Sequence, residues 1–511
     1  HDRVKQAAYL LIPEEQKKST HLNIGQLLLN NTPREKHEER IFDIVNQLNY
    51  GVDLIKSQEQ LNQLAHLNLI AGRKAKISTA YNAASQYLNS ALEIISTDSW
   101  QSQYNLTLAL YENACDAAYL CGDYEKMEQL AQKVIDNGAS LLDKIGTYEI
   151  QIQGNIVQNK LTNALTIAID ILKLIGIKFP DTPSQLDIQQ AFQRTAEKLA
   201  DKEIPDLIYL PEMTDPNILA AMRILLSMFP AAYVGCPEFV PLVSLKMVDL
   251  SMQYGNTGIS AFGYCTYGFL LCGVIGDIEA GYEFGQLCLN VLSKTDTTSL
   301  QAKILLPYNS FIGHWKNHAQ QYLIPLQEVY KIGIENGDLE FACYGLQNYS
   351  FSSYLTGQEL TNIEQEMALY CKTIQKLQQT SSLYSTQIWR QTVLNLMGRS
   401  EDRCCLVGEA YNENTMLPIH YEMNYLMAIE IVYFNKLVLN YLFNNLKIAL
   451  LHSAEAEKFL PSVTSSIIVP IFYFYDSLVR LAAYKEVAPL EKNQFLEKVD
   501  SNQNKMKHWA N

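Results

Sequence analysis

Glycine and proline are scarce in this sequence, which has 24 and 16 of them among 511 residues. Together they make up under 8% of the chain, against a usual share of about 12%. Strand-like alternation of apolar and polar residues is also almost absent. Both deficits argue against a turn-rich all-β sandwich or barrel.

The sequence also lacks the short motifs by which enzymes hold nucleotides or activate nucleophiles. It has no G-x-x-x-x-G-K-[ST] phosphate loop, no H-R-D or D-F-G kinase motif, no G-x-S-x-G elbow and no G-x-G-x-x-G fingerprint. We therefore predict that this chain is not itself an enzyme. We assign it no catalytic, cofactor-binding or metal-binding residues.

The sequence has too few cysteines for a disulfide-rich or zinc-binding protein and too little positive charge for a nucleic-acid-binding protein. Ten cysteines without any C-x-x-C pair suit neither a disulfide scaffold nor a zinc site, so we expect buried free thiols in the cytoplasm. The net charge of −14 disfavours nucleic-acid binding, which needs a clustered cationic surface. Residues 250–276 carry no charge but hold six glycines and several polar residues. We read them as a buried, closely packed helix and expect no membrane span.

Helical periodicity runs through almost the whole chain. Between Gly122 and Gly138, apolar residues fall on one stripe of a helix and charged residues on the other side. Such helices come in pairs separated by short breaks. We place the breaks near residues 80–82, 122–123, 159–160, 276–277, 317–318, 357–358 and 444–445.

The spacing of these breaks indicates a repeat protein. The breaks at 122 and 159 lie 37 residues apart, and those at 276, 317 and 357 lie 41 and 40 residues apart. Such a period is typical of a helical solenoid. The pattern A-x-x-Y-L-x-x-A-L from Ala84 to Leu92 resembles tetratricopeptide repeats. The period exceeds the 34 residues of that family, and its Trp-Leu-Gly pattern is absent. We therefore predict an all-α, tetratricopeptide-like superhelix of helical hairpins.

Irregular segments interrupt this pattern. Residues 177–185, 202–217 and 398–418 read as ordered loops, with a helix at 185–200 between the first two. The first 50 residues read as helices at 2–11 and 15–30, a loop at Pro33 and a helix from Glu35. From these interruptions we expect a first repeat array at 51–200, a second at 201–400 and C-terminal repeats at 401–511.

A few residues are candidates for chemistry. His314 and His318 lie four apart and could share a metal ion, although an exposed helix end explains them as well. Asp476 and Arg480 have the spacing of an intrahelical ion pair, and Glu430 lies in an apolar helix. The 31 tyrosines could line a binding groove or pack between helices.

Several segments resemble one family of signalling proteins. The first 28 residues, including Ile12-Pro13-Glu14-Glu15, look like the helical end of the winged-helix part of signal-transduction NTPases. The rest is similar to the helical region of very large cyanobacterial-type hybrid signalling proteins. The segments that carry this resemblance are 39–55, 67–92, 211–225, 276–285, 395–402 and 469–482.

This resemblance implies a place within a longer polypeptide. In that family a Ser/Thr kinase domain precedes the NTPase, and a GAF domain and a histidine kinase follow the helical region. Residues 1–50 would then end the NTPase-associated module, and ATP and Mg²⁺ would bind only in flanking domains. The implied partners are those NTPase and kinase domains, together with a protein or small-molecule effector.

The sequence thus predicts a non-catalytic connector of a two-component signalling kinase, which binds an effector and couples the NTPase to the histidine kinase. Two alternatives remain open at this point. One is a stand-alone tetratricopeptide-like scaffold for protein interactions. The other is an all-α enzyme with a cavity that no motif reveals.

Overall fold

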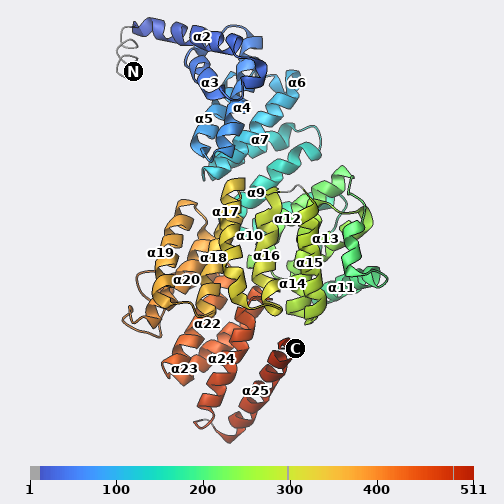
Figure 1. Cartoon of the computed structure of the whole chain (residues 1–511), viewed down its shortest axis with the longest axis vertical. Helices are drawn as coiled ribbons and strands as arrows, with labels where there is room; N and C mark the ends of the chain where they lie inside the picture. The colour runs from blue at the N-terminus through green and yellow to red at the C-terminus, as the bar shows by residue number, and fades with distance from the viewer. Residues whose placement is uncertain (1–11, 296–297, 487, 511) are drawn as a thin grey trace. The chain divides into compact units, whose positions relative to one another are not determined.

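The computed structural model describes residues 12–295, 298–486 and 488–510, and within them the protein is all-α. The only β-type pairings among the described residues are two isolated bridges, Glu212 with Asn256 and Val407 with Asn412. The chain forms two compact units, residues 1–154 (unit 1) and 155–511 (unit 2). Figure 1 draws the helices of unit 1 in blue and cyan. The predicted helix at 2–11 lies outside the described residues.

Unit 1 consists of helices that pack on their neighbours along the chain. Its elements are α2 (Glu14–Asn31), η1 (Arg34–Lys36), α3 (Ile41–Tyr50), η2 (Val52–Leu54), α4 (Gln58–Ile77), α5 (Tyr81–Ile94), α6 (Ser99–Ser102), α7 (Tyr104–Leu120), α8 (Tyr124–Asn137), η3 (Leu142–Lys144) and the start of α9 (Ile145–Val157). Helices α4 and α5 form one hairpin, and α7 and α8 form another.

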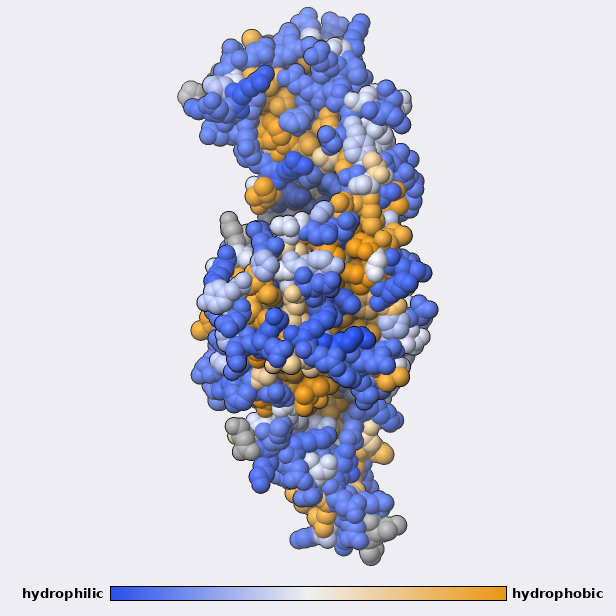
Figure 2. All heavy atoms as spheres, turned by 90° about the vertical axis from the view of Figure 1, so that its right-hand side faces the viewer, coloured by the Kyte–Doolittle hydropathy of each residue, from blue (hydrophilic) through white to orange (hydrophobic). Residues whose placement is uncertain are grey.

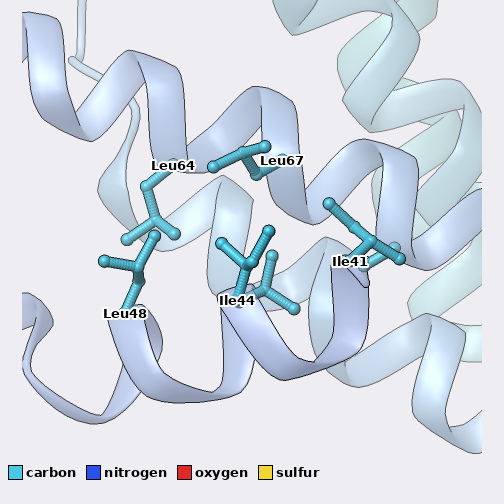
Figure 3. Close-up of a cluster of buried hydrophobic side chains, with 7 residues drawn as sticks. Ile41, Ile44, Leu48, Leu64 and Leu67 are labelled. Carbon is cyan, nitrogen blue, oxygen red and sulfur yellow. The ribbon is translucent and has the colours of Figure 1, made fainter. Parts of the chain in front are cut away.

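The core of unit 1 follows directly from helical periodicity. Ile41, Ile44 and Leu48 lie on one stripe of α3 and meet Leu64 and Leu67 of α4. Figure 3 shows these side chains pointing toward one another between the two helices. Burying one such side chain stabilises the fold by about 1.5–3 kcal/mol.

Unit 2 continues with longer and more apolar helices. Its elements are α10 (Leu161–Leu174), α11 (Gln185–Leu199), η4 (Ile204–Tyr209), α12 (Pro216–Gly235), α13 (Phe239–Tyr254), α14 (Gly258–Leu270), the π-helix η5 (Leu271–Ile275), α15 (Ile278–Lys294), η6 (Thr298–Leu300), α16 (Gln301–Pro307), the π-helix η7 (Tyr308–Ile312), η8 (Gly313–Trp315), η9 (Ala319–Tyr322), α17 (Leu323–Asn336), α18 (Leu339–Leu355), α19 (Leu360–Lys376), α20 (Thr380–Leu396), α21 (Glu413–Glu422), α22 (Leu426–Leu442), α23 (Leu446–Phe459), η10 (Leu460–Val463), α24 (Ile468–Ala483) and α25 (Pro489–Trp509).

The hairpins share one type of turn. At most breaks a single residue has a positive φ, the next residue is the N-cap, and the second helix begins one residue later. In the α7–α8 turn, for example, Gly122 has φ +74° and the amide of Asp123 donates to the carbonyl of Ala118 at 2.9 Å. This is the geometry of a Schellman cap. The same bond joins Asn445 to Asn440 at 2.7 Å.

The uncharged stretch 250–276 contains the closely packed buried helix that was predicted, but it is not one continuous helix. It spans the last turn of α13, a break at residues 255–257, all of α14 and the π-helix η5, and α15 packs against its glycines. A β-carbon on Gly281 would lie 2.4 Å from the sulfur of Cys272 and 2.7 Å from the carbonyl of Gly268. By length and composition α12 and the α14–η5 segment could each span a membrane, yet 78% and 83% of their apolar windows are buried within the protein.

Most predicted breaks are confirmed, and two boundaries were wrong. The helix expected from Glu35 begins only at Ile41, because residues 34–36 form a 3-10 turn after Pro33. The loop expected at 398–418 ends at Asn412, whose side chain caps α21 by accepting from the amide of Asn414. Pro418 is therefore accommodated inside a helix. The division of the array at residues 200 and 400 remains a prediction.

All ten cysteines are free. Six are buried and four are half-buried.

Hydrophilic residues cover most of the face drawn in Figure 2, with apolar residues in scattered patches. Single exposed apolar residues such as Ile77 and Leu451 are common on protein surfaces.

Candidate functional site

The main candidate site is a cavity inside unit 2, with a volume of about 70 Å³. Aromatic and aliphatic side chains make up most of its wall. Its lining residues are Phe229, Pro230, Tyr233, Val234, Phe262, Leu306, Pro307, Phe311, Phe341, Tyr344, Gln347, Asn348, Phe351, Tyr425, Met427, Ile431, Val463, Ser466 and Ile468.

One helix supplies a continuous stripe of this wall. Tyr344, Gln347, Asn348 and Phe351 lie at positions i, i+3, i+4 and i+7 of α18, so they share one face of the helix. This face is buried except at Tyr344, which is half-buried. The cavity therefore lies along the side of α18 rather than at its end.

Backbone irregularities occur on two other sides of the cavity. Pro230 sits inside α12, where it has no N–H to bond the preceding turn. Pro307 ends α16 and is followed directly by the π-helix of residues 308–312. Such π-turns concentrate at functional sites. Both irregular segments supply lining residues, so the cavity lies where regular helix packing is interrupted.

The rings of the wall pack mainly edge to face or tilted. Phe229 meets Phe262 with ring centroids 5.0 Å apart and planes at 89°. Tyr233 meets Phe311 at 5.2 Å and 44°. Such pairs contribute about 0.5–1.5 kcal/mol beyond the burial of their area. The aromatic wall is therefore stiff and offers ring edges and faces to an occupant.

Polar groups are few in this wall, and most have partners. The Tyr425 hydroxyl lies 2.7 Å from Ser385 Oγ and donates to the carbonyl of Ser381 at 2.9 Å. Gln347 is 4% exposed, and its Nε2 donates to the sulfur of Met427 at 3.7 Å, a weak acceptor. Among the described lining residues, only Gln347 has a buried polar side-chain atom without a partner, its Oε1.

Two buried carboxyls lie on the helices behind the wall. Burial raises the pKa of Glu430 on α22 well above its usual value, and neither of its oxygens has a hydrogen-bond partner. Burial, followed by the charge of Asp338, raises the pKa of Glu340 on α18 to about 7. The hydroxyl of Tyr344, which lines the cavity, donates to Glu340 Oε1 at 3.1 Å.

A buried histidine lies close to the same region. His420 is fully buried among the rings of Tyr384, Tyr411 and Tyr425, at centroid distances of 5.3–6.0 Å. Neither ring nitrogen has a partner, and burial lowers the pKa of His420 to about 4. The imidazole is therefore neutral at physiological pH.

The arrangement suits binding rather than catalysis. None of the residues lining the cavity is Asp, Glu, Lys, Arg or His, and none could act there as a strong acid, base or metal ligand. No group of three or more metal-ligating side chains exists among the described residues. An apolar wall with one convergent polar group is typical of a small-molecule site.

The residues singled out from the sequence lie elsewhere or have structural partners. His314 and His318 do not share a helix face, because they fall in one 3-10 turn and at the cap of the next. The predicted ion pair is confirmed, with Arg480 Nη2 at 2.9 Å from Asp476 Oδ1. Asp476 is fully buried and also accepts from Asn502 Nδ2 at 2.8 Å.

Comparisons with known proteins point to signalling. No family model matches the chain. The chain is 24% identical, over 420 residues, to hybrid signal transduction histidine kinase G of Dictyostelium discoideum. The match covers 74% of this chain and 12% of the relative. The chain is thus a helical region with distant similarity to a hybrid histidine kinase.

Among solved structures, the chain matches a circular tandem repeat protein with novel repeat topology and enhanced subunit contact surfaces. The match is 11% identical and covers 97% of this chain and 98% of that one, with a TM-score of 0.13. The helical-hairpin architecture rests instead on the helices and turns of the protein itself.

No motif in the sequence indicates the cavity specifically. Its residues range from Phe229 to Ile468, and no local motif links them. Tyrosine abundance was the nearest signal. Tyr233, Tyr344 and Tyr425 do line the cavity, whereas Tyr354 packs against Trp389 at a centroid distance of 5.7 Å.

Proposed function

We propose that this chain is a non-catalytic regulatory region of a hybrid signalling kinase, and that a small effector bound in the aromatic cavity controls it. The observation that carries the proposal is the cavity itself, an apolar site at the meeting point of several helical hairpins. Distant similarity to a hybrid histidine kinase supports the signalling context.

The site is placed to influence several hairpins at once. Its wall takes residues from α12, α14, α16, α18, α22 and α24. In a helical array each hairpin contacts its neighbours, so a change in packing at one interface propagates to the next. An effector acts in this way only if it binds one packing arrangement more tightly than another.

The finer assignment follows the family resemblance. The N-terminal 50 residues would end a winged-helix NTPase module, and the array would couple that NTPase to a histidine kinase in the cytoplasm. ATP and Mg²⁺ would bind in those flanking domains. The chain spans 12% of the length of the relative it matches, which is consistent with a segment of a larger protein.

The first test is the coding sequence on both sides of this segment. We expect an upstream phosphate loop and a downstream histidine kinase in one reading frame. A gene that encodes neither would contradict the kinase context and favour a stand-alone scaffold.

The second test fills the cavity in the full-length protein. Val463 lines the cavity and is 2% exposed, so Val463→Phe adds a ring's volume at its wall. Leu451→Phe is the matched control, because Leu451 is 62% exposed on α23. We expect Val463→Phe to change histidine autophosphorylation by about five-fold or more, a common size of allosteric coupling. Equal activity of both variants and the wild type, with folding verified, would refute the regulatory role of the cavity.

A further inference from the structure

We propose that the cavity binds a small uncharged molecule with an apolar body and one hydrogen-bond-donating group, such as a phenol or a short alcohol, and that Gln347 is its anchor. This inference rests on the proposed function, because it names the ligand class of the same site. Four features of the cavity support it: its size, its lack of charge, the free amide oxygen and the aromatic wall.

The volume limits the size of the enclosed part of the ligand. A cavity of about 150 Å³ is known to hold benzene. The cavity of about 70 Å³ is roughly half that size, so it encloses part of a six-membered ring, and the rest of the ring lies toward the open side. A ring with one small substituent is therefore the upper limit of ligand size, and a short branched chain fits more easily.

The wall excludes charged ligands. A charged group that enters an apolar site without an opposite charge loses its hydration and gains no partner. The side chains that line the cavity carry no charge. The carboxyl of Glu430, although close in sequence to the lining residues Met427 and Ile431, is not part of the wall. Carboxylates and ammonium groups should therefore bind poorly.

Gln347 determines which polar group the ligand carries. Its Nε2 faces the sulfur of Met427, which can only accept a hydrogen bond, so the amide oxygen is the free atom. A buried acceptor without a partner costs about 1–3 kcal/mol. A ligand O–H or N–H that reaches Gln347 Oε1 removes this cost, and an isosteric ligand without a donor does not.

The aromatic residues favour a ring over a flexible chain. Four aromatic rings form a connected set on one side of the cavity. Phe229 meets Phe262 edge to face and stacks on Tyr233, and Tyr233 meets Phe311 at a tilt. An inserted ring can extend this set with the same geometry. A rigid ring also loses less conformational entropy on binding than a chain of equal size.

The test compares three probes of nearly equal size on the complete 511-residue chain. Phenol has a ring and a donor, toluene has the ring without a donor, and benzoate has the ring with a negative charge. Binding is measured by ligand-observed NMR titration against wild type, Gln347→Leu and Gln375→Leu. Gln375 is exposed on α19 and does not line the cavity, so it controls for the same chemical change elsewhere.

We expect phenol to bind wild type and Gln375→Leu at least ten-fold more tightly than toluene, and benzoate to bind more weakly than either. In Gln347→Leu the preference for phenol over toluene should disappear while toluene still binds. Equal binding of phenol and toluene to wild type would overturn the inference, and so would an unchanged preference in Gln347→Leu. Tighter binding of benzoate than phenol would also overturn it.

The ligand titration and the autophosphorylation assay test separate claims. If phenol binds as expected but Val463→Phe leaves autophosphorylation unchanged, the ligand class stands and the regulatory function fails. If autophosphorylation responds to Val463→Phe but phenol shows no preference over toluene, the function stands and the ligand class fails.

Discussion

Replacing Glu340 by glutamine should stabilise the protein relative to wild type, and this gain should grow as the pH rises. Glu340 lies in the first turn of α18 and is 5% exposed. Burial is the main cause that raises its pKa to about 7, and the charge of Asp338 adds to it. Lys303 and the hydroxyl of Tyr344 oppose this shift only in part. In the unfolded chain the same carboxyl titrates near 4.5.

The sign and size of the effect follow from these two values. Between pH 4.5 and 7 the folded protein holds a proton on Glu340 that the unfolded chain has lost, so the free energy of unfolding falls as pH rises. Each pKa unit is worth about 1.4 kcal/mol, and a shift of about 2.5 units gives a loss of about 3 kcal/mol by pH 8. Glutamine has the same shape, can still accept from Tyr344 and does not titrate.

Urea unfolding at pH 4.5, 6, 7 and 8, followed by tryptophan fluorescence, measures this difference. Three of the four tryptophans, Trp315, Trp389 and Trp509, lie in unit 2 and report on the part of the chain that holds Glu340. We expect the unfolding free energy of Glu340→Gln minus that of wild type to be about 3 kcal/mol higher at pH 8 than at pH 4.5.

A chain of two units need not unfold in one step, so the stability around Glu340 should also be measured locally. Hydrogen exchange of peptides from α18 provides this local measurement. The control is Glu328→Gln on the neighbouring α17, whose carboxyl side chain is 48% exposed beside Lys331. If the free energies of unfolding of Glu340→Gln and wild type differ by the same amount at every pH, the reasoning is refuted.

Three further predictions concern stability. The pKa of His420 is lowered to about 4, so wild type should lose about 3 kcal/mol as pH falls from 6.5 to 4, and His420→Leu should lose less over that range in urea titrations. Gly281→Ala should lower the unfolding free energy by about 1–3 kcal/mol, because its methyl group would meet Cys272. Its control is Ser293→Ala at the exposed end of the same helix, which should leave the stability unchanged. Thermal unfolding measures both variants. Asp476→Ala should cost about 3–5 kcal/mol by leaving the partly buried Arg480 unpaired, and Asp476→Ala with Arg480→Leu should recover part of this loss.

Turn positions could be predicted from the sequence where glycine or asparagine occupies them. Gly122, Asn159 and Asn444 have φ between +57° and +74°, a conformation that these residues adopt most readily. Gln378 adopts φ +57° at the α19–α20 turn without any such signal. There the packing of the two helices determines the turn, and no local preference reveals it.

Core helices could also be predicted, because burial of an apolar stripe depends on spacing within one helix. Ile41, Ile44 and Leu48 show this in unit 1. The cavity could not be predicted in the same way. Its wall joins residues more than 200 positions apart, such as Phe229 and Ile468, and their apolar character is the same as that of ordinary core residues.

The difference between core and cavity lies in how regularly the helices pack. Where glycines such as Gly268 and Gly281 let α14 and α15 approach closely, the interface is filled. Where Pro230 interrupts α12 and Pro307 leads into a π-helix, large rings meet at irregular angles and leave about 70 Å³ open. The wall is nevertheless buried, and it contains the unpartnered oxygen of Gln347. Leucine at that position would pack without this cost, so the glutamine is more readily explained by a ligand than by stability.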